Sequence, residues 1–419
     1  MSHSLDGFTP SSIERPESLD ELSSTLATVS TSGRSATPWG GGTRIGVGNI
    51  PSSYDTAIDL SGFTGEIEHE PGDMTVVANA GGTIGYLNAL LAKEGQRLAF
   101  EVRKPDRATV GGSVASNAPG RRQSSTGGIR DWVIGMQIVL ADGTITKTGG
   151  RVVKNVQGYE LHRLHTGAYG TLGVVSQAAF KLLPLPLEQQ TIIAWFDDET
   201  TANEVGMKLV NGLFLPEAIS VLSGPLAKHT VEATGETVST DDVTTLLIKL
   251  GGGIRSIERQ VNEVVGAAGA AAARGYAVLS DVSERAACAK LEDAESNSSL
   301  TVRMTSRPLE TLEASKATRT KISNLHSHDI STISDLGFGA STILSNPAND
   351  DDASAFTTIF VDEISQHSGS YVIEMCPLNV KQSIDVFSDV GSSIDLMRRI
   401  KAQYDPTNTL NPGRFAGKI

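Results

Sequence analysis

A glycine-rich stretch between Pro38 and Gly48 has the composition of a phosphate-binding loop. It reads Pro38-Trp39-Gly40-Gly41-Gly42-Thr43, and Gly46 and Gly48 follow. A loop with few side chains exposes many backbone N–H groups and lets a pyrophosphate approach the main chain closely. The third glycine of a G-x-G-x-x-G fingerprint is missing, because Pro51 stands in its place, and no Lys follows as in a P-loop. The stretch therefore predicts a dinucleotide site of neither common type.

A second stretch of small residues has matching chemistry. It runs from Thr109 through Gly111, Gly112 and Ser113 to Gly120. Backbone N–H groups and hydroxyls are suitable donors to phosphate oxygens without help from Lys or Arg. Either stretch alone is explained equally well by a tight turn. Together they predict two loops that grip one pyrophosphate from opposite sides.

Two further stretches carry the same kind of signal. Gly167, Gly170 and Gly173 lead directly into a strand expected from Val174, so backbone there can pass close to a flat ring, although a plain β-turn also explains these glycines. Near the end of the sequence, the segment 404–415 is fixed by prolines and glycine where most chains fray. We expect this last segment to dock onto another part of the molecule.

Several helices and strands are expected to position these stretches. Ser18 to Glu21 is a capping box that opens a helix to about Ser30, and a second helix is expected over Thr83–Lys93. Asp350 to Ser354 is interpreted as a polar surface loop, and no internal repeat is apparent. Strands are expected at Thr56–Leu60, Glu66–Glu70, Thr75–Asn79, Val133–Leu140, Thr144–Thr148, Val174–Leu183, Thr191–Phe196 and Thr244–Leu250.

The order of these motifs resembles a known family. A Pro-x-Gly-Gly-Gly-Thr loop, a Thr-x-Gly-Gly-x-x-Ala-x-Asn stretch, an Ala-Asp-Gly hairpin and Gly-x-x-Gly-Thr-Leu-Gly-Val follow one another as in the PCMH-type FAD-binding domain of the vanillyl-alcohol oxidase superfamily. Leu396 to Lys401 and Asn411 to Phe415 are most similar to the E subunits of bacterial glycolate oxidases. The resemblance implies an FAD-dependent oxidoreductase that acts on 2-hydroxy acids.

The resemblance also implies an α+β fold. Residues 1–186 would form a PCMH-type FAD-binding domain with two subdomains, residues 187–384 an α+β cap that contacts substrate, and residues 385–419 a segment that returns to the FAD-binding domain. Gly251-Gly252-Gly253 between a strand and a helix approximates a Rossmann unit, with Ser256 in place of the third glycine. A β-turn-α unit of the cap explains this stretch without NAD.

The resemblance assigns the cofactor site residue by residue. One set would contact the FAD pyrophosphate, a second set would lie opposite, a third would lie on the adenine or ribose side, and Arg414 would sit near the flavin ring. Gly42 or Thr43 stands where some relatives attach FAD to a His, so non-covalent FAD is expected. The residues expected at the pyrophosphate are Pro38, Gly40, Gly41, Gly42 and Thr43. The residues expected opposite them are Thr109, Gly111, Gly112 and Ser113, and those expected on the adenine or ribose side are Gly170, Gly173 and Val174.

The catalytic groups are not specified by any motif. His326, His328, His367 and Glu374 have the residue types of a metal site, but the i, i+2 spacing of the first pair does not place both on one helix face, and no metal is expected. Arginines beside the second glycine-rich stretch are either anion-binding groups or surface charges. These are Arg121, Arg122 and Arg130.

Composition restricts the partners. A net charge of −13 argues against nucleic acid or an anionic membrane surface. The two cysteines, Cys288 and Cys376, cannot ligate an iron–sulfur cluster and are interpreted as buried or inert. Met1 to Pro10 lacks the apolar core of a secretory signal, and no apolar run is long enough to span a bilayer, so a cytoplasmic protein is expected.

Three roles follow from these expectations. The chain is a catalytic FAD subunit that passes electrons to a related flavoprotein and an iron–sulfur subunit, a non-catalytic FAD-binding subunit of such a complex, or a free-standing hydroxy-acid oxidase. A reductase of the UDP-N-acetylenolpyruvoylglucosamine type would share the fold, but no motif supports it.

Overall fold

The computed structural model describes residues 3–151, 158–213, 216–238, 243–325, 330–367 and 369–419. The chain divides into two compact units, and neither is one continuous stretch. The first unit contains Met1–Gly120, Gly127–Leu185 and Asp385–Ile419, and the second contains Arg121–Thr126 and Pro186–Ile384. The short segment Arg121–Thr126 therefore groups with the second unit, although its neighbours on both sides belong to the first.

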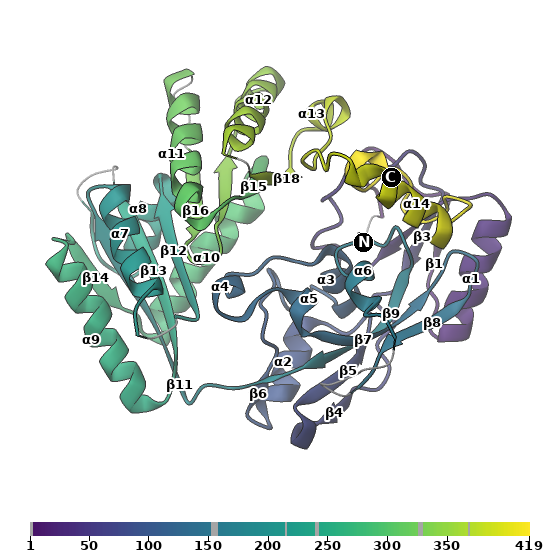
Figure 1. Cartoon of the computed structure of the whole chain (residues 1–419), viewed down its shortest axis with the longest axis horizontal. Helices are drawn as coiled ribbons and strands as arrows, with labels where there is room; N and C mark the ends of the chain where they lie inside the picture. The colour runs from purple at the N-terminus through teal and green to yellow at the C-terminus, as the bar shows by residue number, and fades with distance from the viewer. Residues whose placement is uncertain (1–2, 152–157, 214–215, 239–242, 326–329, 368) are drawn as a thin grey trace. The chain divides into compact units, whose positions relative to one another are not determined.

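A small parallel sheet and one helix form the first part of unit 1. Strands β1 (Ser12–Glu14), β2 (Ala36–Trp39) and β3 (Thr56–Asp59) pair in the order β1-β3-β2. Helix α1 (Leu19–Thr31) starts at Ser18, whose side chain accepts a hydrogen bond from the Glu21 N–H, and buries a stripe of apolar residues against these strands. Figure 1 shows α14 (Ser393–Tyr404), in yellow, beside these purple elements from the other end of the chain.

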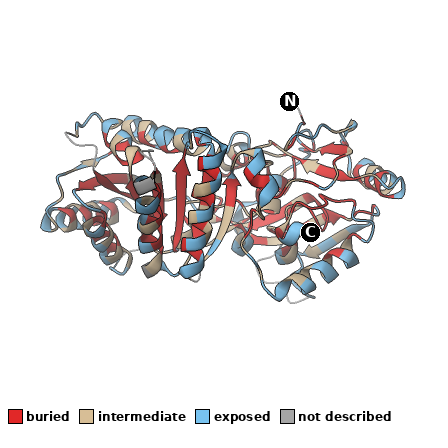
Figure 2. Cartoon of the chain, turned by 90° about the horizontal axis from the view of Figure 1, so that it is seen from above, coloured by how far each residue is buried: buried red, intermediate tan, exposed pale blue. Residues whose placement is uncertain are grey.

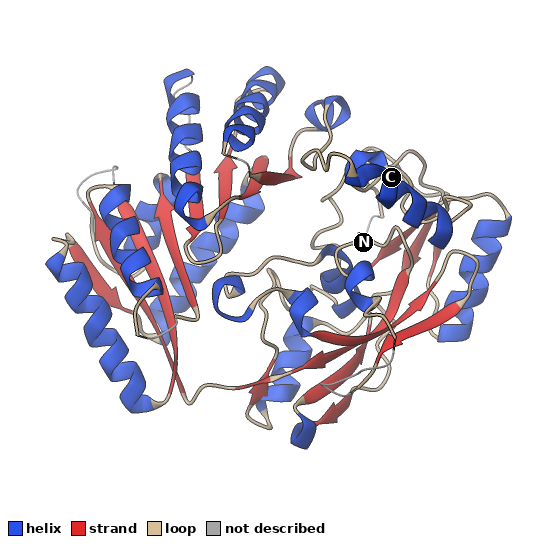
Figure 3. Cartoon of the chain, viewed as in Figure 1, coloured by secondary structure: helices blue, strands red, loops and turns tan. Residues whose placement is uncertain are grey.

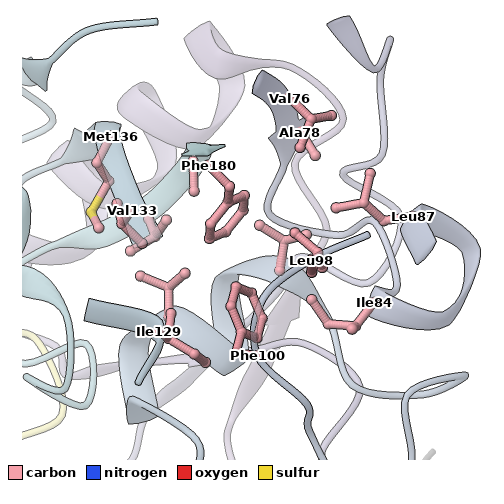
Figure 4. Packing of buried hydrophobic residues seen from close by; sticks show 14 of the residues in the cluster. Val76, Ala78, Ile84, Leu87, Leu98, Phe100, Ile129, Val133, Met136 and Phe180 are labelled. Atoms are coloured by element: carbon pink, nitrogen blue, oxygen red, sulfur yellow. The ribbon is translucent and has the colours of Figure 1, made fainter. Parts of the chain in front are cut away.

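A five-stranded antiparallel sheet forms the second part of unit 1. Its order is β4-β5-β9-β7-β8. Helices α2 (Ile84–Ala92), α3 (Val110–Ser116) and α5 (Ile129–Trp132) supply apolar residues that pack against one face, around Phe180 (Figure 4). The strands are β4 (Glu68–Glu70), β5 (Thr75–Asn79), β7 (Val133–Val139), β8 (Ile145–Gly149) and β9 (Val174–Lys181).

Short elements complete unit 1. Strands β6 (Gln96–Arg97) and β10 (Leu183–Pro184) pair with each other. The remaining pieces are η1 (Pro71–Asp73), α6 (His162–His165) and η2 (Ala416–Lys418).

Unit 2 is built on one eight-stranded sheet in which every neighbouring pair is antiparallel. Its order is β14-β11-β13-β12-β16-β17-β15-β18. Figure 3 shows its strands in red and the helices packed on them in blue. The strands are β11 (Glu188–Phe196), β12 (Ala218–Ser223), β13 (Thr244–Gly252), β14 (Gly275–Val278), β15 (Leu300–Thr305), β16 (Ser331–Asp335), β17 (Ala340–Ser345) and β18 (Ser370–Met375).

The sheet of unit 2 contains a structural repeat. The first four strands lie in the order β14-β11-β13-β12, and the last four lie in the equivalent order β18-β15-β17-β16. Each half follows a β-α-β-β-α-β course, with α7 (Glu199–Val210) and α9 (Ile254–Ala270) in the first and α11 (Pro308–Leu325) and α12 (Asp350–Gln366) in the second. The halves join where β12 pairs with β16. The expectation of no repeat is therefore wrong at the level of structure, because the repeat lies in topology and not in shared residues.

Helices cover both faces of this sheet. Residues of α7 and α9 share one apolar cluster with the sheet, and residues of α8 (Pro225–Glu232) and α10 (Asp281–Asn297) share another with its opposite face. Figure 2 shows the strands buried and the outer sides of the helices exposed. The last elements of unit 2 are α4 (Gln123–Thr126) and α13 (Leu378–Ser383).

The structure corrects one local expectation in unit 2 and supports another, the β-turn-α interpretation of the stretch Gly251-Gly252-Gly253. Asp350 to Ser354 is the first turn of helix α12 and not a loop, because the Asn349 side chain accepts a hydrogen bond from the Asp352 N–H and the acidic residues favour a helix N-terminus. The Rossmann-like stretch is not a Rossmann unit, because β11 lies between β13 and β14 and is antiparallel to both.

Candidate functional site

A groove in unit 1 brings the glycine-rich stretches together. Two adjoining cavities of about 540 and 420 Å³ share Pro38, Gly40, Thr109, Tyr169 and Asn411 in their walls. The first cavity is also lined by Gly41, Gly42, Thr43, Arg44, Ile45, Val47, Gly112, Ala115, Ser116 and Arg414. The second is also lined by Trp39, Leu60, Ala80, Gly111, Gly112, Ala115, Gly170, Gly173, Val174 and Val175.

The first glycine-rich loop is pressed against the chain in front of α3. A Cβ at Gly41 would lie 1.6 Å from the Arg107 carbonyl oxygen, and a Cβ at Gly40 would lie 2.1 Å from the Thr109 hydroxyl. Among the described residues, no backbone hydrogen bond is donated by the N–H groups of Gly40, Gly41 or Gly42. These glycines therefore allow two chain segments to meet and leave N–H donors available to a ligand.

The second glycine-rich stretch is a helical turn and not a loop. Thr109 caps α3, and its hydroxyl accepts a 3.3 Å hydrogen bond from the Gly112 N–H. The N–H groups of Val110 and Gly111 donate to the carbonyls of Gly82 and Ala80. These bonds direct the start of α3 toward the protein, so the first loop supplies most of the uncommitted backbone donors.

The third glycine-rich stretch is fastened to α3. The N–H groups of Gly167 and Tyr169 donate to the carbonyls of Val114 and Ala115, at 3.0 and 2.8 Å. Tyr169 has a left-handed backbone, with φ of 53°, and its ring packs against Phe415. This turn thereby forms a wall of the groove between α3 and the C-terminal segment.

Arg414 holds the end of the first loop in place. Arg414 is 3% exposed. Its guanidinium donates to the carbonyls of Ile45, Val47 and Asn49 and to the Asp6 carboxylate. Burial lowers the pKa of Arg414, and the charge of Asp6 opposes that shift. These bonds use both terminal nitrogens, so Arg414 shapes the loop while it lines the groove.

A buried Lys–Asp pair locks the C-terminal segment to the third stretch. Lys401 Nζ donates to the Asp405 carboxylate at 2.6 Å and to the carbonyls of Thr171 and Leu410 at 2.9 and 2.8 Å. Burial lowers the pKa of Lys401, and the charge of Asp405 opposes that shift without cancelling it. Asp405 also accepts bonds from the N–H groups of Thr409 and Leu410.

The groove contains most of the residues expected from the sequence. All the expected cofactor residues line it except Ser113, whose buried hydroxyl has no partner within the described chain. Their contact with a cofactor remains a prediction. Tyr169, Ser116 and Asn411 also line the groove. Of these three residues, only Asn411 lies in the C-terminal segment that we expected to dock onto another part of the molecule.

Two of the three arginines beside α3, Arg121 and Arg122, lie in unit 2 and face carboxylates. Arg121 is 3.6 Å from Glu295, and Arg122 is 3.6 Å from Glu217. Burial raises the pKa of Asp335 nearby to about 6, against the charges of Arg121 and Arg303. This balanced cluster does not favour an anion-binding role for Arg121 or Arg122. Arg130 is exposed on α5.

The groups considered for acid–base chemistry fall only in part on the described residues. His326 and His328 lie outside the described residues. In the part of the chain that the structure describes, no group of His, Cys, Asp or Glu is arranged to hold a metal. Cys288 is exposed and Cys376 is half-buried, so burial does not describe either thiol, and the expectation that they are inert stays a prediction. A catalytic base therefore stays unassigned.

The groove fits an anionic dinucleotide such as FAD. Arg44 and Arg414 line it, whereas the lining residues in the described chain include no Asp or Glu. The glycine loop offers backbone donors to a pyrophosphate. Trp39, Leu60, Ala80 and Val174 supply apolar walls to the second cavity, and the buried amide oxygen of Asn411 has no partner within the described residues.

Comparison with known families places the cofactor domain in this part of the chain. Residues 10–149 match the FAD binding domain family, and residues 389–415 match the C-terminal domain of FAD linked oxidases. The second match contains Lys401, Asp405, Asn411 and Arg414. Within the described residues, no helix is long and apolar enough to cross a membrane.

The curated relatives of this chain include glycolate oxidase subunits and a D-lactate dehydrogenase. The chain is 28% identical to glycolate oxidase subunit GlcD of Bacillus subtilis, over 98% of this chain and 89% of that protein. It is 36% identical to glycolate oxidase subunit GlcE of Escherichia coli, over 31% of this chain and 37% of that protein. It is 31% identical to D-lactate dehydrogenase of Archaeoglobus fulgidus, over 43% and 40%.

Solved structures share the fold at low identity. p-Cresol methylhydroxylase has a TM-score of 0.73 at 16% identity, over 96% of this chain and 88% of that chain. Alkyldihydroxyacetonephosphate synthase has a TM-score of 0.72 at 16% identity, over 96% and 76%. The chain therefore shares the fold of these structures, contains matches to the FAD binding domain and to the C-terminal domain of FAD linked oxidases, and is similar in sequence to glycolate oxidase subunits and D-lactate dehydrogenases.

Proposed function

We propose that this chain binds FAD non-covalently and is the flavin subunit of an enzyme complex that oxidises a small 2-hydroxy acid. The observation that carries the proposal is the groove of unit 1, in which a side-chain-poor loop, helix α3 and the C-terminal Arg414 meet. The relatives named for glycolate oxidase and D-lactate dehydrogenase favour the substrate class. When bound, FAD supplies the two-electron acceptor that such an oxidation needs.

The proposed cofactor contacts follow the walls of the groove. The N–H groups of Gly40, Gly41 and Gly42 would bind the pyrophosphate, with Thr109 and Gly112 opposite. The glycines of the third stretch and Val174 would lie on the adenosine side. Residues 187–384 would serve as the substrate-contacting cap.

The mode of FAD attachment can be tested directly. Thr43, and not His, follows the glycines in the loop that lines the groove. Acid precipitation of the purified protein should release the yellow cofactor into the supernatant. Flavin that stays on the precipitated protein would contradict non-covalent binding.

Catalysis by this chain is tested by anaerobic reduction. The purified holoprotein should lose the visible absorbance of its oxidised flavin on addition of glycolate, D-lactate or D-2-hydroxyglutarate. The alternative is a non-catalytic FAD-binding subunit, which is favoured by the pairing of Arg121 and Arg122 with carboxylates. A flavin that remains oxidised with every substrate, yet is reduced by dithionite, would support that alternative.

The proposed electron acceptor is another protein. Relatives are named as subunits, GlcD and GlcE, and this favours a related flavoprotein as partner. Affinity capture from native cells should recover a second flavoprotein and an iron–sulfur protein. Recovery of the chain alone, with full turnover of hydroxy acid by oxygen, would instead identify a free-standing oxidase.

A further inference from the structure

We propose that an N-terminal strap, residues 3–9, holds the first glycine-rich loop in the conformation that binds FAD, so that attachment of the strap and binding of the cofactor reinforce each other. The inference rests on the proposed binding of FAD in the groove. The structure describes the whole strap, and none of its residues lines either cavity. The strap therefore acts on the site from behind and not as a ligand.

The strap is a tight turn of defined shape. Around Asp6 and Gly7, the backbone groups of Leu5 and Phe8 exchange two hydrogen bonds of 2.9 and 2.8 Å. Both central residues have positive φ, 49° and 85°, as a type I′ turn requires. Asn suits such a position as well as Asp does. The Asp6 carboxylate can therefore be replaced by an amide without a change in the turn.

Two residues of the strap support groove walls from behind. The His3 ring packs edge-on against Trp39, with ring centroids 4.9 Å apart. Leu5 is 4% exposed and shares an apolar cluster with Trp39 and Ile45. Trp39 lines the second cavity, and Ile45 lines the first. Detachment of the strap would therefore expose apolar surface on two residues that form the groove.

Polar contacts fasten the start of the strap to Trp39. His3 Nε2 donates to the Asp59 carboxylate at 3.1 Å. The Tyr54 hydroxyl donates to the His3 carbonyl at 2.8 Å and accepts a 2.6 Å hydrogen bond from Trp39 Nε1. One chain of hydrogen bonds thereby joins the strap to a wall of the groove.

The tip of the strap supplies a counter-charge to Arg414. Arg414 Nη1 donates to Asp6 Oδ2 at 3.2 Å. The same guanidinium donates to three carbonyls at the end of the glycine-rich loop, those of Ile45, Val47 and Asn49. A buried cation that loses its ionic partner is strongly destabilised. Asp6 therefore stabilises the cation that fixes the end of the loop.

The loop needs such outside support because it has little of its own. Its glycines have no side chains to pack, and the N–H groups of Gly40, Gly41 and Gly42 donate no backbone hydrogen bond within the described chain. A loop that is ordered before the ligand arrives binds it more tightly, because less conformational entropy is lost on binding. Linkage requires the converse, that bound FAD strengthens attachment of the strap by the same factor.

Neutralising the tip of the strap tests the coupling. Asp6→Asn keeps the turn but removes the counter-charge of Arg414, and the dissociation constant for FAD should rise about tenfold. Asp20→Asn is the matched control, because it removes the same charge from an exposed residue in the first turn of α1 and should leave affinity unchanged. Equal affinity of Asp6→Asn and wild type would overturn the proposal, since a purely structural strap, attached alike with and without FAD, changes stability but not affinity.

Hydrogen exchange tests the converse on the unaltered protein. The Leu5 and Phe8 amides donate the two bonds of the turn, and an isolated turn of this length does not keep them. Their exchange should slow about tenfold when FAD occupies the groove. Equally fast exchange in apoprotein and holoprotein would overturn the proposal, even if Asp6→Asn did not fold. A wild-type protein that binds no FAD would instead overturn the proposed function on which the inference rests.

Discussion

Gly41 and Gly46 stand in one loop but face different surroundings. A Cβ at Gly41 would collide with the Arg107 carbonyl at 1.6 Å, and a Cβ at Gly46 would meet nothing within 4 Å. The glycines of the loop are therefore not equivalent, and the need for glycine at Gly41 comes from the protein and not only from the ligand.

Gly41→Ala should displace the loop from the chain in front of α3. We expect FAD affinity to fall at least tenfold and the free energy of unfolding to fall by about 1–3 kcal/mol, as in other overpacked sites. Gly46→Ala should change both quantities little. Fluorescence titration measures FAD affinity, and urea denaturation measures the free energy of unfolding. Similar losses of affinity and stability in both variants would contradict a special requirement for glycine at Gly41.

Asp335 makes stability depend on pH. Burial raises its pKa to about 6, above the usual value near 3.8, so the folded protein binds the proton more tightly than the unfolded chain. This contribution to stability is complete below about pH 4 and is lost as pH rises through about 6. Arg121 and Arg303 limit the shift, and Glu295 adds to it.

Asp335→Asn should remove that dependence while it keeps an acceptor for the Ser220 hydroxyl, 2.6 Å from Asp335 Oδ1. We expect the change in unfolding free energy between pH 5 and pH 8 to be smaller in the variant by about 1–2 kcal/mol, allowing for partial solvent screening. Urea denaturation at both pH values measures it. An unchanged difference would show that other groups control this pH range.

Some residues of the groove could be predicted from the sequence, and others could not. The glycine loop was predictable because its composition is itself the signal. Tyr169 and Asn411 were harder to assign, because their roles depend on which carbonyl each one meets. Arg122 was ambiguous for the same reason, since its partner Glu217 is distant in sequence.

Among the elements, the C-terminal segment from α14 to Phe415 contributes Asn411 and Arg414 to the groove. Lys401 is buried and joins α14 to Thr171, Asp405 and Leu410. Removal of one partner from a buried ion pair leaves the other charge uncompensated. This segment is therefore stabilised by polar contacts more than by an apolar face.

Lys401→Met should lower the free energy of unfolding by about 3–5 kcal/mol, since Asp405 stays buried without its counter-charge. Arg398→Met, on the same helix, removes an exposed pair with Asp395 and should cost at most about 1 kcal/mol. Urea denaturation of both apoproteins measures the difference. Equal losses would show that Lys401 is not a structural lock.

Elements were predictable where local patterns decide them. The capped helix α1 and the hairpin β7–β8 follow local rules, and both are present. Helix α3 was missed because glycine and serine disfavour helices. There a tertiary contact overrides propensity, since only glycine fits at Gly111, where a Cβ would lie 2.7 Å from Ala80 Cβ.

Across the whole molecule, the groove depends on residues from both ends of the sequence. Pro38 and Gly40 meet Asn411 and Arg414 there. No local pattern predicts such a meeting. The family resemblance implied it, and the repeat in unit 2 escaped notice because it lies in strand order alone.

A chain that stops at Gln403 should bind FAD at least a hundredfold more weakly, because it lacks Asn411, Arg414 and the Asp405 partner of Lys401. A chain that lacks only Gly417–Ile419 keeps every groove residue and should bind FAD normally. Fluorescence titration compares the two. Unchanged affinity in the longer deletion would show that the C-terminal segment is not part of the site.

The division of unit 1 into three stretches has a consequence for synthesis. Its last stretch, Asp385–Ile419, follows nearly all of unit 2 in the chain. A ribosome therefore synthesises the glycine loop long before it synthesises Arg414. While unit 2 is made, the nascent loop lacks the hydrogen bonds that Arg414 donates to its carbonyls. Cofactor capture should accordingly be among the last events of biogenesis, and a prematurely terminated chain should emerge colourless.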